Sequence, residues 1–79
     1  MVVSEFKDKQ GKFYGFVERS NEPYRGVLKL VNASNISEVF REKEVTLSYD
    51  AIFGPDVDDV REWGEQVESW TKEIEDGVS

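Results

Sequence analysis

The chain has 79 residues, a net charge of −7, and neither cysteine nor histidine. A chain this short closes one core, so we expect one domain over residues 1–79, and without cysteine it holds no disulfide and no thiolate nucleophile or metal ligand. Hydrophobic residues make up 38% of the sequence, which argues against disorder. Because it shows neither a signal-peptide centre nor an apolar run approaching the roughly 20 residues of a membrane span, the sequence predicts a soluble, cytoplasmic protein.

Charge is divided unevenly along the chain. Residues 1–49 hold eight basic and seven acidic side chains, a balance of +1. Residues 50–79 hold two basic and ten acidic side chains, a balance of −8. The acidity therefore belongs to the C-terminal third.

The first 49 residues form a β-rich half. Residues 2–6, 12–19 and 24–31 combine aromatic and β-branched side chains and are separated by turn-forming stretches, which predicts three strands. Gly15 lies inside the second of them and indicates either a bulge or another group close to the backbone. Residues 44–49 alternate apolar and polar side chains, which predicts a further half-buried strand.

Residues 35–42 fit two structures. Three apolar side chains follow the i, i+3, i+4 spacing of a helical stripe: Ile36, Val39 and Phe40. Asn35 with Glu38 has the form of a helix capping box. We therefore expect a short helix near residues 35–42, with a hairpin strand as the alternative.

Residues 56–76 predict one long, acidic, amphipathic helix. Asp56 is placed to cap its start and Gly77 to end it. At 100° per residue, the apolar side chains fall on one side: Val57, Val60, Trp63, Val67, Trp70 and Ile74. The acidic side chains fall on the other side: Asp58, Asp59, Glu62, Glu65, Glu73 and Asp76.

Together these elements predict an α+β fold. We expect a small, mainly antiparallel sheet of three to five strands, covered on one face by the long C-terminal helix. The expected core draws on both layers: Phe6, Phe16, Leu28, Leu30, Val45, Leu47, Phe53, Val60, Trp63, Val67, Trp70 and Ile74.

No group of residues in the sequence suggests catalysis, so we expect no catalytic residue, cofactor or metal, and a protein that is not an enzyme. A pair of carboxylates can act as acid and base only in a cleft that raises one pKa, which a chain this small seldom forms beside its core. Residues 56–59 lack the glycine and the closing glutamate of a calcium-binding loop. A negatively charged helix start explains them.

The acidic helix face is the first candidate interaction site. Like charges three or four residues apart cost a helix stability, whereas such a row can imitate nucleic-acid phosphates and attract a basic protein. Small acidic proteins of phages and mobile elements are similar in this respect. The pattern suggests a non-catalytic DNA mimic that binds or inhibits a basic, nucleic-acid-acting protein through five carboxylates: Asp58, Asp59, Glu62, Glu65 and Glu73. The alternative is a face that only maintains solubility.

The aromatic strand is the second candidate. Its stretch KFYGFVER resembles the RNP1 signature of RRM domains, with Phe13 where that signature has glycine and Arg19 where it has an aromatic residue. Together with the preceding residues it is also similar to the early segment of cold-shock domains. The resemblance implies single-stranded nucleic acid stacked on exposed aromatic rings beside cations, here Lys12, Tyr14, Phe16 and Arg19. The negative charge of the whole protein opposes such binding.

Trp63 and Trp70 belong to a third pattern, the 3-4-3-4 spacing of a coiled-coil seam. Packing of this side against the sheet explains the spacing as well, so we expect both tryptophans in the core. A homodimer through a partly exposed tryptophan edge is the alternative to a monomer.

Overall fold

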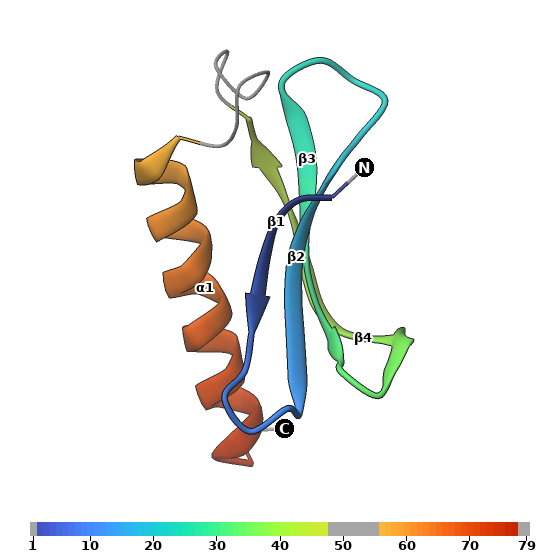
Figure 1. Ribbon diagram of the computed structural model, residues 1–79, viewed down its shortest axis with the longest axis vertical. Helices are drawn as coiled ribbons and strands as arrows, with labels where there is room; N and C mark the ends of the chain where they lie inside the picture. Colours follow the sequence, from blue (N-terminus) through green and yellow to red (C-terminus); the bar gives the residue numbers. More distant parts are fainter. Residues whose placement is uncertain (1, 48–55, 78–79) are drawn as a thin grey trace.

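The structure, a computed structural model, describes residues 2–47 and 56–77 and shows an α+β fold (Figure 1). Its elements are β1 (Val2–Lys7), β2 (Phe13–Arg19), β3 (Arg25–Asn32), β4 (Asn35–Thr46) and α1 (Val57–Glu75). The strands form one antiparallel sheet in the order β1-β2-β3-β4. Helix α1 lies along one face of this sheet, and no other described element covers the opposite face, here called the open face.

Short turns join the first three predicted strands, which are confirmed. Between β1 and β2, the carbonyl oxygen of Asp8 accepts the Gly11 N–H at 3.1 Å, and the Asp8 carboxylate accepts the Lys12 N–H at 3.3 Å. Gly11 has a φ of 73°, a backbone conformation that glycine adopts without steric cost. Residues 8–12 therefore form the turn between the first two predicted strands, as their polar and glycine content indicates.

The short helix predicted near residues 35–42 is wrong, because these residues belong to β4. Asn32 pairs with Asn35, but the next pair is Val31 with Val39, so residues 36–38 bulge out of the ladder. The capping-box residues serve this hairpin instead. Asn35 accepts the Ser37 N–H at 3.2 Å, and Glu38 accepts from the Asn32 side-chain amide at 3.3 Å. The hairpin strand, the alternative in the sequence, is the structure found.

The core lies between the sheet and α1, and one predicted member is wrong. Its buried side chains are Phe13, Val17, Leu28, Leu30, Leu47, Trp63 and Trp70. Phe16 is half-buried outside this cluster, because Gly15 faces α1 and strand alternation turns its two neighbours to the open face. Among the other predicted members, Phe6, Val45, Val60, Val67 and Ile74 pack against the cluster. Phe53 and the end of the predicted strand 44–49 lie outside the described residues.

Helix α1 begins and ends where the sequence predicts. Asp56 accepts the Asp58 N–H at 3.2 Å as N-cap, and Gly77, with a φ of 70°, follows the last turn. Trp63 and Trp70 are only 3% and 9% exposed, so their expected place in the core is confirmed. They present no exposed tryptophan edge through which a second copy could bind.

Candidate functional site

Three of the predicted partner-binding carboxylates form an exposed stripe along α1. Asp58, Glu62 and Glu65 lie three or four residues apart, on the side of the helix away from the buried tryptophans. None of the salt bridges between described residues involves them. We call these three the acidic stripe, because their side chains are exposed and stand outside the ion pairs formed among residues 2–47 and 56–77.

The other two predicted carboxylates, Asp59 and Glu73, lie on the flank of α1 that faces β4. Glu73 is within 4.0 Å of the Arg41 guanidinium, a pair exposed enough to be worth little. Asp59 is half-buried and lines a notch between α1 and β4, together with Glu62, Trp63 and four β4 residues, Lys43, Glu44, Val45 and Thr46. The five predicted residues therefore do not form one surface. Asp58 and Glu65 face solvent, Asp59 and Glu73 lie toward β4, and the exposed Glu62 borders both sets.

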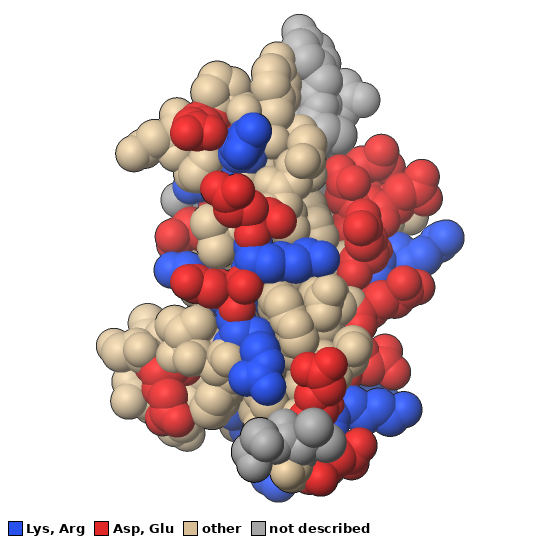
Figure 2. All heavy atoms as spheres, turned by 180° about the vertical axis from the view of Figure 1, so that it is seen from behind, with Lys and Arg blue, Asp and Glu red and all other residues tan. Residues whose placement is uncertain are grey.

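The excess of negative charge lies in the helix layer. The sheet layer, residues 2–47, contains eight basic and seven acidic side chains, whereas residues 56–77 contain nine acidic and two basic ones. In Figure 2 the acidic side chains gather along the edge formed by α1, while acidic and basic ones alternate over the sheet. The unevenness of charge along the sequence is thus an unevenness between the two layers of the fold.

The alternative nucleic-acid residues are only partly brought together. Tyr14 and Phe16 lie on the open face, stacked with ring centroids 5.2 Å apart and planes 28° apart. Lys12 is exposed just before β2. Arg19 pairs with Gly26, whose buried side faces Val17 and Leu47, so the register places Arg19 on the helix side of the sheet.

Two further cations lie beside the aromatic pair: Lys7, which is close to it in the sequence, and Lys29, which the sequence analysis did not place there. Lys7 on β1 is the register partner of Tyr14, and Lys29 on β3 is the register partner of Phe16. Cross-strand partners share a face of the sheet, so both lysines belong to the open face. The alternation within residues 24–31 already separated Lys29 from the core-facing leucines, but its pairing with Phe16 required the strand register.

Tyr14 is also held from β1. Its hydroxyl donates a hydrogen bond to Glu5, the register partner of the neighbouring Phe16. Desolvation, this hydrogen bond and the negative charge of Glu5 together raise the pKa of the Tyr14 phenol above its usual value. Tyr14 therefore stays neutral through the physiological pH range, with its ring fixed between Glu5 and Phe16.

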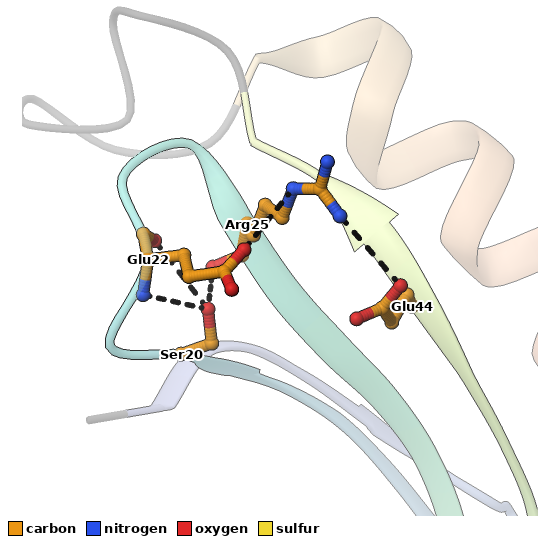
Figure 3. A network of polar contacts seen from close by, with 4 residues as sticks. All are labelled: Ser20, Glu22, Arg25 and Glu44. Atoms are coloured by element: carbon orange, nitrogen blue, oxygen red, sulfur yellow. Dashed lines mark hydrogen bonds and ion pairs between the residues drawn. The ribbon is translucent and has the colours of Figure 1, made fainter.

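Arg25 fastens the loop between β2 and β3 to the far edge of the sheet (Figure 3). Its guanidinium lies 3.4 Å from the Glu22 carboxylate and 3.8 Å from that of Glu44 on β4. The Ser20 hydroxyl donates to the Arg25 carbonyl at 3.1 Å and accepts the Glu22 N–H at 3.2 Å. These contacts order the loop, and they are satisfied within the chain, so we assign this network to the fold.

A shallow groove of about 520 Å³ runs between the β1–β2 loop and the C-terminal half of α1. Phe6, Phe13 and Val67 supply apolar lining, and the charged residues around them are of both signs: Lys7, Asp8, Lys9, Glu68, Lys72 and Glu75. Within the described residues, no group of three or more acidic side chains is arranged to hold a metal ion. The groove shows neither a concentration of one charge nor an arrangement that suggests catalysis.

Comparisons with known proteins add no identity to this geometry. No protein family, curated protein or solved structure matches the chain. Helix α1 is too polar to cross a membrane, and the described part of the chain holds no other helix long enough to do so. Function must therefore be inferred from the surfaces themselves.

Proposed function

We propose that this protein is a non-catalytic interaction protein that binds a basic surface of another protein through the acidic stripe of α1. The observation that carries the proposal is the exposure of Asp58, Glu62 and Glu65 on one side of a capped helix, outside every salt bridge between described residues. Like charges at this spacing reduce helix stability. A partner that neutralises them offsets this cost on binding.

A partner that itself binds nucleic acid fits this stripe best. Its groove is lined with lysine and arginine, which bind carboxylates as they bind phosphates. A rigid helix presents its carboxylates at fixed positions, as a duplex presents phosphates, so the protein would compete with nucleic acid for the same groove. Attraction between the opposite charges would also accelerate encounter, most strongly at low salt. We therefore propose inhibition of a nucleic-acid-acting protein as the specific form of this function.

The test is capture of proteins from a cell lysate on the immobilised chain, followed by competition. A quadruple variant changes Asp58 and Asp59 to Asn, and Glu62 and Glu65 to Gln. We expect it to lose the captured protein while its helical circular dichroism stays native, and we expect duplex DNA to release that protein from the native chain. A captured protein that the variant retains would contradict the proposal.

The matched control removes the same number of negative charges from the sheet layer. It changes four exposed glutamates to Gln: Glu18, Glu38, Glu42 and Glu44. Both variants have the same net charge. A difference between them in capture would therefore show that the partner binds a surface on α1. Equal loss of capture in both would show that total charge, and not the acidic stripe, attracts the partner.

A further inference from the structure

The open face of the sheet has an aromatic centre with a cation on each side of it. Across the strands, the register places Tyr14 between Lys7 and Val31, and Phe16 between Glu5 and Lys29. The aromatic pair lies on β2, one of the two inner strands, so strands flank it on both sides. The acidic stripe belongs to the opposite layer (Figure 1). This arrangement is separate from the surface used in the proposed function.

The stacked geometry leaves ring surface for a ligand. Tyr14 and Phe16 are half-buried and stacked on each other, so each ring turns one side toward its partner and the other side away from it. An unpaired base can extend such a stack, and every base has the flat π surface that this requires. In a duplex these base surfaces are covered by neighbouring base pairs, so a single strand is the form that fits.

Lys7 and Lys29 are the cations beside the pair that can contact a phosphate backbone, and they share this face with the carboxylates of Glu5, Glu18 and Glu42. None of the salt bridges between described residues involves Lys7 or Lys29. Glu42 is the register partner of Lys29, but no salt bridge joins the two. At the other end of the face, Glu44 is engaged by Arg25 at 3.8 Å. The negative charge of the whole protein lies mainly on α1, on the far side of the sheet, where salt screens it within about 10 Å at 0.1 M ionic strength.

From this arrangement we infer that the open face binds single-stranded nucleic acid, with bases stacked on Tyr14 and Phe16 and phosphates placed by Lys7 and Lys29. Stacking supplies affinity with little preference for sequence, and the lysines make the affinity depend on salt. The Glu5 carboxylate holds the Tyr14 hydroxyl and so fixes the position of that ring. Nucleic acid bound here leaves the acidic stripe free.

The experiment is fluorescence anisotropy of a labelled, mixed-sequence single strand titrated with the full chain, at low and at moderate salt. We expect binding at low salt that weakens as salt rises. Phe16→Val removes the ring and keeps a strand-forming side chain, so affinity should fall about tenfold without loss of the fold. Absence of binding at low salt would overturn the inference, and so would undiminished binding by Phe16→Val.

A pair of lysine variants separates local contact from overall charge. Lys29→Gln removes a cation from the open face, whereas Lys43→Gln removes one from β4 on the side of α1, where Lys43 reaches Gln66 at 3.1 Å. Both variants have the same net charge. We expect only Lys29→Gln to weaken binding and to flatten its dependence on salt. Equal effects of the two variants would overturn the inference, as would equal affinity for a duplex of the same sequence.

Discussion

At the scale of single residues, Gly15 and Gly64 both lie where the sheet meets α1, and the space around them differs. A methyl group on Gly15 would come within 2.9 Å of Val67 Cγ2, whereas one on Gly64 would lie 3.5 Å from the Phe6 ring, an ordinary contact. Val67 is β-branched and stiff within the helix, so it yields little space. We expect Gly15→Ala to lower the free energy of unfolding by about 1–3 kcal/mol. We expect Gly64→Ala to raise it by up to about 1 kcal/mol, because alanine favours the helix interior.

Urea unfolding of both variants measures these changes. The double variant with Gly15→Ala and Val67→Ala should lose less free energy of unfolding than the sum of the losses in the two single variants. The methyl group added at position 15 no longer meets the valine side chain in the double variant. If Gly15→Ala is as stable as the native chain, the packing of α1 on β2 differs from that described here.

The raised pKa of Tyr14 gives a prediction for alkaline pH. A phenol whose pKa is higher in the folded than in the unfolded chain stabilises the fold fully below its unfolded value near 10.0, and that stabilisation is lost as pH rises through the folded value. Tyr14→Phe should remove this part of the pH dependence. Ultraviolet titration of the tyrosines should show a transition above pH 10.0 that disappears in Tyr14→Phe and moves to lower pH in Glu5→Gln. An unchanged titration in Glu5→Gln would show that Glu5 does not act on Tyr14.

At the scale of elements, α1 was predictable because its signals are local. The cap at Asp56, the glycine at 77 and the 3.6-residue period lie within the helix or next to it, and each has the predicted role. The same period predicts which carboxylates face solvent, since the buried tryptophans fix the opposite side. It does not show that Glu73 and Asp59 lie beside β4, because that depends on how the helix is placed on the sheet.

Strand β4 was misread because its hydrophobic spacing comes from pairing with another strand. Two register shifts, one at residues 36–38 and one at Phe40, break the period of two, and the resulting spacing of Ile36, Val39 and Phe40 imitates a helix. Val39 pairs with Val31, and the Phe40 ring packs at 5.6 Å against that of Phe13, contacts that no local pattern shows.

The face of the sheet on which Phe16 lies could have been predicted from the sequence. A glycine that lets another group approach must face that group, so both of its neighbours face away.

At the scale of the whole molecule, the two layers carry different charge, and this difference should govern how stability responds to salt. The sheet layer is close to neutral, whereas α1 with its cap and last turn holds nine acidic and two basic side chains. Two opposing effects follow. Salt screens repulsion among the helix carboxylates, which stabilises the fold, and it screens attraction between α1 and the cations of the sheet, which destabilises it.

Distance decides which of the two effects is larger. Along the acidic stripe, Asp58 and Glu62 lie about one helical turn apart, as do Glu62 and Glu65, and such like pairs cost about 0.2–0.5 kcal/mol each. Arg61 is spaced to attract Asp58 and Glu65 and offsets part of this cost. Between the layers, the described residues form one salt bridge, Arg41 with Glu73, at 4.0 Å and exposed. Repulsion within the helix should therefore dominate. We expect the free energy of unfolding to rise by about 0.5 kcal/mol as sodium chloride is raised from about 0.01 to 0.1 M, where the screening length falls from about 30 to 10 Å.

Urea unfolding at the two salt concentrations provides the measurement, and the quadruple variant of the acidic stripe and Asp59 provides the control. That variant lacks most of the like-charge pairs, so its stability should rise less with salt than that of the native chain. A native chain that loses stability as salt is added would instead show that attraction between the layers outweighs repulsion within α1. In that case the carboxylates would stabilise the fold and would have less free energy to gain from a basic partner.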